Sequence, residues 1–283
     1  MAFAVLTLFK NSGMVKVLAD FLRIIVRTVN ANVKTVMKPV VIHLPHSAQH
    51  IPDFIRNSML VTDNELMQDM VAFTDWRTRD IFTHRAFPNR VVFPVSRMVC
   101  DPERYRSDKD ESMSKVGLGA VYQNDAFLRP LRCLDALQRE LILRLYYDPH
   151  HKALTKAVET QITRHGHCII VDAHSFSSVP LPYEPDQSDD RPDICIGTCR
   201  EHTPRLLERR AVTFFQSKGL SVSVNSPYAG TMVPLKFWRD PSVQSIMVEI
   251  NRGLYRKMEA LKPSSGYATI KNAIGEFLSV CAL

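Results

Sequence analysis

Short apolar runs alternate with longer helical patterns from Val40 onward, and this alternation limits the possible folds more than any other feature of the sequence. Most of the runs are continuously apolar, which is typical of strands buried on both faces of a parallel sheet. We therefore predict a single α/β domain in which helices cover both faces of a mixed, mostly parallel central sheet. The expected strands span residues 40–44, 91–95, 168–172, 194–197, 221–225 and 246–250.

Helical patterns fill the intervals between these runs. They are expected at residues 63–73, about 126–147, 149–164, 204–218 and 267–278, and the proline-rich segment 179–192 is expected to be a surface loop. Residues 1–36 are basic and compatible with a helix, which fits a transit-like peptide or a plain upstream segment. We treat residues 1–36 as an N-terminal extension and residues 37–283 as the folded domain.

Composition limits the classes of partner that we expect the chain to bind. The chain has 36 Lys and Arg against 29 Asp and Glu, but much of the excess lies near the N-terminus and basic residues are otherwise scattered, so we expect no nucleic-acid partner. The sequence contains no apolar stretch approaching the about 18–20 residues that cross a bilayer, so we expect no membrane span. The six cysteines are interpreted as reduced thiols, which predicts a cytoplasmic protein.

Polar residues cluster where the predicted strands end. His46 follows the strand at 40–44, His174 follows the strand at 168–172, and Asn225 and Tyr228 come at and after the end of the strand at 221–225. Open α/β sheets bind ligands in the crevice beyond the carboxyl ends of their strands. The pattern therefore predicts a functional site at this edge of the sheet.

His46 and His174 are the best candidates for metal ligands, because each follows a buried strand and is followed at once by Ser. A catalytic zinc needs a third protein ligand and keeps its fourth position for water. Asp75 and Asp172 both offer a carboxylate; we favour Asp75 as the ligand and interpret Asp172 as a residue that orients a ligand or caps a loop. Six other histidines carry no such pattern and are expected to be ordinary core or surface residues: His43, His50, His84, His165, His167 and His202.

Glu249 is the only acid in an otherwise apolar strand. An ionised carboxylate is costly to bury without a partner, so Glu249 either pairs with Arg252 or another basic group, or faces a polar cavity as a general base. Arg97 and Arg104 follow the strand at 91–95, and guanidinium groups bind carboxylates and stabilise oxyanions. The alternative is that both arginines pair with local acids, of which Asp101 is one.

Six motifs in this order resemble the N-formylglutamate amidohydrolase family. The similarity spans roughly residues 40–255, and no single motif is specific by itself. The motifs are Pro45-His46-Ser47, Thr74-Asp75-Trp76, Ser96-Arg97 with Asp101 and Arg104, Asp172-Ala173-His174-Ser175, Asn225-Ser226-Pro227-Tyr228-Ala229-Gly230, and Glu249-Ile250-Asn251-Arg252-Gly253-Leu254-Tyr255.

The resemblance implies a fold related to the zinc carboxypeptidases, with about eight strands in the sheet. It implies a Zn²⁺-dependent enzyme that hydrolyses N-formyl-L-glutamate, a small acidic N-acyl amino acid, to formate and glutamate. The implied metal ligands are His46, Asp75 and His174. The implied catalytic residues are Glu249, as the base, and Arg104, and the implied substrate-binding residues are Arg97, Asn225 and Tyr228.

The sequence departs from the family pattern at positions expected to contact the substrate. Ala48 stands where the first motif usually ends in Gly, Glu103 stands where the family has Asn, and Gly230-Thr231 replaces paired glycines. A related N-acyl amino acid is therefore an alternative substrate. Two other hypotheses remain open at this stage, a carboxypeptidase-like peptide hydrolase and a non-catalytic binder of acidic small molecules, and the oligomeric state is left open.

Overall fold

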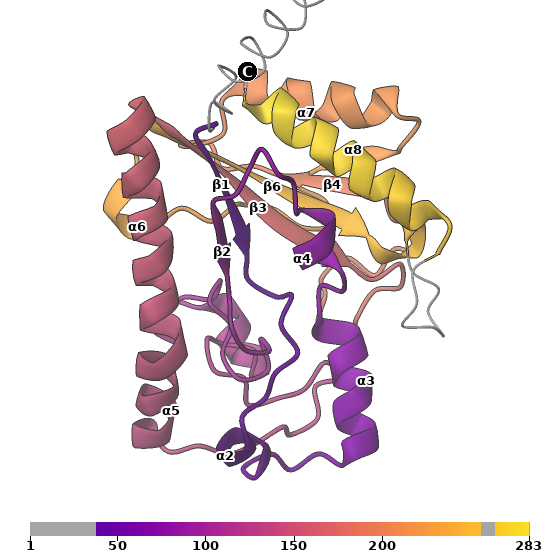
Figure 1. The fold of residues 1–283 in the computed structure, drawn as a ribbon. Coiled ribbons are helices and arrows are strands. Elements are labelled where there is room, and N and C mark those ends of the chain that lie inside the picture. The colour runs from indigo at the N-terminus through magenta and orange to yellow at the C-terminus, as the bar shows by residue number, and fades with distance from the viewer. Residues whose placement is uncertain (1–37, 256–263, 283) are drawn as a thin grey trace, which may run out of the picture. The chain divides into compact units, whose positions relative to one another are not determined.

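A mixed sheet of six strands forms the centre of the computed structural model, which describes residues 38–255 and 264–282 (Figure 1). From Pro39 onward these residues belong to one compact unit, and the predicted N-terminal extension lies outside the described residues. The strand order is β2-β1-β3-β6-β4-β5, and only the β4–β6 pair is antiparallel. The strands are β1 (Val40–Leu44), β2 (Arg90–Val92), β3 (Cys168–Phe176), β4 (Ile194–Gly197), β5 (Val222–Val224) and β6 (Val243–Asn251).

The α/β class and the mixed, mostly parallel sheet are confirmed, but the implied count of about eight strands was wrong for the residues that the structure describes. The six observed strands correspond to the six apolar runs of the sequence, because those runs supply the side chains that a sheet covered on both faces must bury. Strands β3 and β6 are longer than predicted. They pair over nine residues, from Cys168 opposite Val243 to Phe176 opposite Asn251, so the ladder continues through polar positions.

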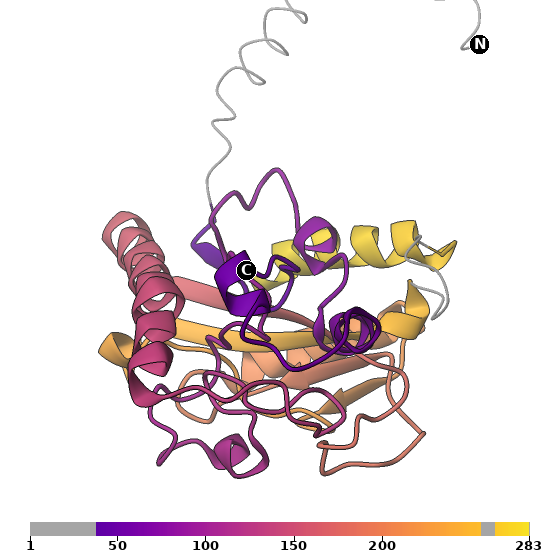
Figure 2. The ribbon, with the colours of Figure 1, turned by 90° about the horizontal axis from the view of Figure 1, so that it is seen from below.

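The two faces of the sheet differ in chemistry, because successive side chains of a strand point to opposite faces. One face is apolar along its length: Ile42, Val171 and Val248 belong to a cluster that includes α4 (Thr78–Ile81), α7 (Arg205–Ser217) and α8 (Gly266–Cys281). Figure 2 shows α8 on this side of the sheet. The opposite face starts apolar, with Val41 and Ile170 packed on α6 (Asp148–His165).

Further along the strands, this second face becomes polar. Counting in steps of two from Val41 and Ile170 leads to His43 in β1 and to Asp172 and His174 in β3. All three are buried, so the fold holds them in place inside the protein. The same alternation therefore makes an apolar core on one face and a polar site on the other.

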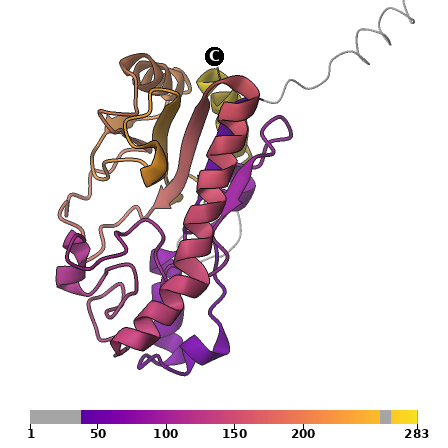
Figure 3. The same ribbon diagram turned by 90° about the vertical axis from the view of Figure 1, so that its left-hand side faces the viewer.

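Helices and loops frame this polar edge. Helix α3 (Asp63–Phe73) begins with a capping box between Thr62 and Glu65. Helix α5 (Ala136–Ile142), the π-helix η2 (Leu143–Tyr147) and α6 form one continuous helical run, seen in Figure 3, where two separate helices were predicted. Pro149 lies within this run, directly after the π-helical turn. The short elements are α2 (Asp53–Arg56), η1 (Ser112–Val116), η3 (Leu235–Phe237) and η4 (Arg252–Leu254).

The segment between β2 and α5 has little regular structure, yet it carries several candidate site residues. Its buried side chains, among them Phe93, Met98 and Tyr122, form an apolar cluster with Phe73 of α3. The buried guanidinium of Arg132 donates hydrogen bonds to the carbonyls of Met98, Val99 and Tyr122, at 2.7, 2.9 and 2.7 Å. These contacts fix the backbone from which the site arginines project.

Among the described helices, none is long and apolar enough to span a membrane.

The packing of α7 on α8 gives a direct test of the fold. Phe215 is fully buried with its ring centroid 4.8 Å from that of Phe277, so Phe215→Ala should lower the free energy of unfolding by about 3–5 kcal/mol. Leu206 lies on the same helix but is 51% exposed, and Leu206→Ala should change the free energy of unfolding by no more than about 0.5 kcal/mol. Urea unfolding measures both. Equal effects of the two variants would contradict the observed packing.

Candidate active site

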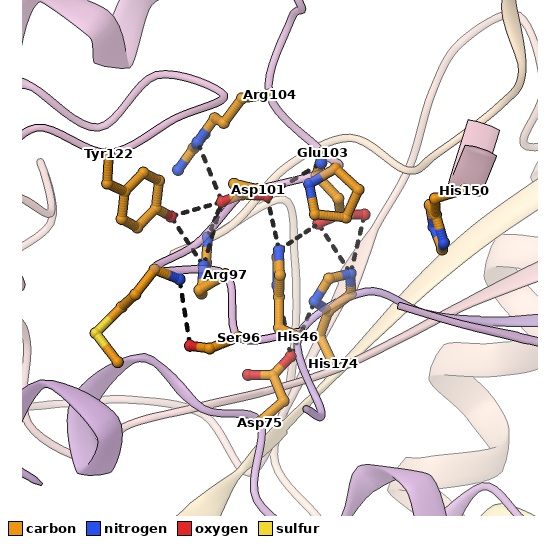
Figure 4. A network of polar contacts seen from close by, with 12 residues as sticks. His46, Asp75, Ser96, Arg97, Asp101, Glu103, Arg104, Tyr122, His150 and His174 are labelled. Atoms are coloured by element: carbon orange, nitrogen blue, oxygen red, sulfur yellow. Dashed lines mark hydrogen bonds and ion pairs between the residues drawn. The ribbon is translucent and has the colours of Figure 1, made fainter. Parts of the chain in front are cut away.

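Three predicted metal ligands converge at the polar edge of the sheet (Figure 4). His46 follows β1, Asp75 follows α3, and His174 lies within β3 and not after it, because the β3–β6 ladder continues past this position. The Nδ1 atom of His174 lies 3.1 Å from Asp75 Oδ2, and the Nδ1 atom of His46 lies 3.7 Å from the same oxygen. The two imidazole centroids are 5.1 Å apart, so the three side chains surround a common point.

Carboxylates contact the Nε2 atom of each imidazole, which we call its outer nitrogen, whereas the Nδ1 atoms of His46 and His174 are the inner nitrogens. His46 Nε2 donates to Asp101 Oδ1 at 2.9 Å, and His174 Nε2 contacts Asp172 Oδ1 at 3.1 Å and the Glu103 carboxylate at 3.2 Å. An ionised carboxylate only accepts hydrogen bonds, so a proton on Nε2 leaves Nδ1 of a neutral His46 with a free lone pair. That Nδ1 atom is buried and has no hydrogen-bond partner within the described ranges 38–255 and 264–282.

This arrangement fits a divalent cation. Metal-binding imidazoles normally donate their outer N–H to a carboxylate or carbonyl, which fixes the ring and strengthens the ligand. Burial lowers the pKa of His46 and so favours the neutral form that binds metal. Burial also opposes the charge of His174, but the nearby Glu103 and Asp172 carboxylates raise its pKa well above the usual value. A site with this excess of negative charge is suited to hold a cation.

Glu249 lies beside this cluster, directly opposite His174 in the β3–β6 ladder. Its carboxylate is buried, and its Oε2 atom has no hydrogen-bond partner among the residues that the structure describes. Burial raises the pKa of Glu249 to about 8. The alternative of an ion pair with Arg252 does not occur, since the Arg252 guanidinium donates to the carbonyls of Val71, Ala72 and Thr74. Glu249 therefore lines the cavity without an ion pair to Arg252.

A cavity of about 260 Å³ adjoins the cluster. Arg97 and Arg104 line it, and both lie beside one carboxylate, that of Asp101. Arg97 donates from Nε and Nη2 to Asp101, at 3.2 and 2.7 Å, and from Nε to Tyr122 at 2.9 Å. Arg104 approaches Asp101 at 3.7 Å, and among the described residues its guanidinium donates no hydrogen bond. The site thus offers guanidinium donors to a ligand.

The two other predicted substrate-binding residues lie in different surroundings. Tyr228 lines the cavity and donates its hydroxyl hydrogen to Glu184 at 2.8 Å. Asn225 does not line it: its amide pairs with Thr198, accepting from the backbone N–H at 2.8 Å and donating to the hydroxyl at 2.7 Å. Asn225 has a φ of 57°, a left-handed conformation that Asn tolerates, and so shapes the turn that leads to Tyr228.

Sequence reasoning missed a second polar group next to the first. His43 Nδ1 lies 2.7 Å from Asp172 Oδ1 and 3.7 Å from Glu103, and its Nε2 lies 2.8 Å from His150. We had expected His43 to be an ordinary histidine. The signal was present, because His43 is the single polar residue of the run at 40–44, as Glu249 is in the predicted run at 246–250. Asp101 was considered only as a partner for arginine, although it also holds His46.

An α/β sheet with buried imidazoles, carboxylates and a glutamate around one small cavity is typical of hydrolytic enzymes. The N-formylglutamate amidohydrolase (FGase) family model matches residues 38–256, and the chain belongs to this family. Family membership identifies an amidohydrolase, as the motifs of the sequence predicted. None of the curated proteins matched the chain.

Two solved structures share the fold. The N-formylglutamate amidohydrolase from Ralstonia eutropha JMP134 is 23% identical, with a TM-score of 0.72, over 86% of this chain and 93% of that chain. A gene product from Agrobacterium tumefaciens is 19% identical, with a TM-score of 0.63, over 86% of this chain and 90% of that chain. The six-stranded sheet and its helices therefore form an architecture that these two solved structures also have.

Metal binding can be tested without measuring activity. The variant His46→Asn should lose stoichiometric binding of Zn²⁺, because it removes the unpartnered Nδ1 atom. Asp101→Asn should weaken binding by about 10- to 100-fold, since it alters the group that orients His46. Equilibrium dialysis followed by metal analysis gives both values. The exposed His167→Asn is the control, and metal affinity in His46→Asn equal to that of this control would show that the cluster binds no metal.

Proposed function

We propose that this chain is a zinc-dependent amidohydrolase that cleaves the amide bond of N-formyl-L-glutamate or a related N-acyl amino acid. One observation carries the proposal: inward-facing atoms of His46, Asp75 and His174 lie within 4.8 Å of one another, beside a buried Glu249 whose Oε2 atom has no hydrogen-bond partner among the described residues. Two imidazoles and one carboxylate are a ligand set that catalytic zinc uses. Family membership supports the same reaction class.

His46, Asp75 and His174 would hold the metal ion through Nδ1, Oδ2 and Nδ1. When bound there, zinc lowers the pKa of a coordinated water from about 15.7 towards about 7 and polarises a carbonyl oxygen. Asp101, Asp172 and Glu103 keep the two imidazoles oriented by accepting from their outer nitrogens. The protein thus supplies both the ligands and the groups that fix them.

Glu249 would act as the base and then as the acid. Its carboxylate takes a proton from the attacking water as the oxygen bonds to the acyl carbon. It then delivers that proton to the amide nitrogen as the C–N bond breaks, which releases the acid and the amino acid. Burial supports this role because it raises the pKa of Glu249 to about 8, so that the ionised group is a stronger base than an exposed Glu.

The arginines would bind the charged parts of the substrate. Arg104 has no hydrogen bond from its guanidinium among the described residues, which leaves its donors for the oxyanion that develops on the acyl oxygen. Arg97 is held by Asp101 and Tyr122 through Nε and Nη2 only, which leaves Nη1 for the α-carboxylate of the substrate. A cavity of about 260 Å³ suits a single N-acyl amino acid better than a peptide.

The variant Glu249→Gln tests the assigned base. It should bind Zn²⁺ as the unmodified chain does and lose about 100- to 10,000-fold in kcat, since Gln cannot accept the proton. The exposed Glu201→Gln is a matched control that should change neither quantity. Hydrolysis can be followed by the appearance of the free amino group. Turnover of Glu249→Gln at the rate of the control would rule out Glu249 as the base.

A further inference from the structure

A second group of potential metal ligands lies next to the first. It consists of His43, Glu103 and Asp172, each of which brings one ligand atom to within 4.8 Å of the other two. His43 Nδ1 lies 2.7 Å from Asp172 Oδ1 and 3.7 Å from Glu103 Oε1. In the first group, the two imidazoles approach the Asp75 carboxylate at 3.1 and 3.7 Å. The second group is therefore as compact as the first.

The ring of His174 separates the two groups. Its Nδ1 atom lies 3.1 Å from Asp75, whereas its Nε2 atom lies 3.1 Å from Asp172 and 3.2 Å from each Glu103 oxygen (Figure 4). Because these two nitrogens are on different edges of the ring, a cation held by one group does not take the place of a cation held by the other. Hydrolytic enzymes are known to use two metal ions side by side.

The Glu103 carboxylate has no hydrogen-bond donor of its own among the described residues. Its one contact at hydrogen-bond distance is His174 Nε2, which carries a single hydrogen and also faces Asp172. Within the described ranges, every ion pair that Glu103 or Asp172 forms within 4 Å is with an imidazole. Two neighbouring carboxylates that share one donor repel each other, and a cation between them would relieve that repulsion.

His43 can supply a lone pair to such a cation. Its Nε2 atom lies 2.8 Å from Nε2 of His150, so one of these two nitrogens carries the hydrogen between them. When His43 donates that hydrogen and His150 accepts it, His43 Nδ1 is left with a lone pair that faces both carboxylates. Metal-binding imidazoles normally have this arrangement, in which an acceptor holds the other ring N–H. Both rings are buried, so their positions are fixed by packing.

We propose that His43, Glu103 and Asp172 form a second site for a divalent cation. One imidazole and two carboxylates are ligands that suit zinc or manganese. The second site should be the weaker of the two, because a cation there displaces the hydrogen that His43 Nδ1 otherwise donates to Asp172. The inference goes beyond the reaction proposed above and does not require it, since binding of an ion can be measured without turnover.

The second site is expected to be a property of this chain and not of the whole family. Glu103 stands where the family has Asn, and an uncharged amide would bind a cation more weakly than a carboxylate does. Glu103 also lines the substrate cavity, where its free carboxylate would repel an acidic substrate. A cation held by Glu103 removes that repulsion, so the second site is compatible with the acidic substrates of the family.

Equilibrium dialysis against a range of free Zn²⁺ concentrations tests the proposal. The unmodified chain should bind two ions, one tightly and one more weakly. Glu103→Gln should keep the tighter ion, because Asp172 still accepts from His174, and should bind the weaker ion at least about tenfold less well. The exposed Glu201→Gln is the matched control and should keep both ions. A single ion in the unmodified chain, or two ions of unchanged affinity in Glu103→Gln, overturns the proposal.

The variant His43→Gln shows where the weaker ion is bound, since other histidines or cysteines also have an affinity for Zn²⁺. It should weaken the same ion as Glu103→Gln does, and the double variant should lose that one ion only. The exposed His167→Asn should keep both ions. A weaker ion that persists in the double variant overturns the proposal. Where His43→Gln fails to fold, Glu103→Gln decides alone, because its side chain is 19% exposed and keeps its shape.

The variant His46→Asn separates this inference from the proposed function. It should lose the tighter ion and keep the weaker one, because His46 belongs only to the first group. A chain that binds one ion, lost in His46→Asn and kept in Glu103→Gln, overturns the inference and leaves the amidohydrolase proposal intact. A chain whose one ion is lost in Glu103→Gln and kept in His46→Asn supports the inference and rejects the zinc site of the proposed function.

Discussion

The parallel pairing of β3 with β6 is the interaction on which the rest of the site depends. It extends over nine residues and sets His174 directly opposite Glu249 in the middle of the sheet. Because the side chains of a strand alternate between faces, the same register points Val171 and Val248 into the apolar core on the other side. A shift of one residue would place apolar side chains in the cavity and charged ones in the core. Folding therefore selects the register that also builds the site.

Buried charge is tolerated here because almost every ionisable group has a partner. Asp101 accepts from both His46 and Arg97, and Asp172 accepts from both His43 and His174. Buried groups linked in this way are held in one geometry, and that geometry leaves the inner nitrogens of the cluster pointing at a common centre. Glu249 differs, because its buried Oε2 atom has no hydrogen-bond partner in the part of the chain that the structure describes. Ionisable groups in such costly surroundings cluster at functional sites, which agrees with the role proposed for Glu249.

The sheet could be predicted from the sequence because apolar runs report burial directly. The strand at Val40–Leu44 and the strand at Ile194–Gly197 were predicted to the residue, as was the helix at Asp63–Phe73. The ends of β3 and β6 were missed, since polar residues such as His174 and Glu249 interrupt the apolar pattern while their backbones continue the ladder. For the described part of the chain, the count of strands implied by the resemblance was too high, whereas the apolar runs themselves numbered six.

The sequence by itself determined the class of fold, the family and the residue types at the site, because each depends on local pattern or on the order of short motifs. Only the tertiary structure decided which partner each charged side chain has. That Arg252 caps α3, that Arg97 and Arg104 share Asp101, and that the Glu249 Oε2 atom has no hydrogen-bond partner among the described residues are facts about distances in the folded chain. Charge pairing falls off within a few ångströms, so it is fixed only when the fold has brought those groups together.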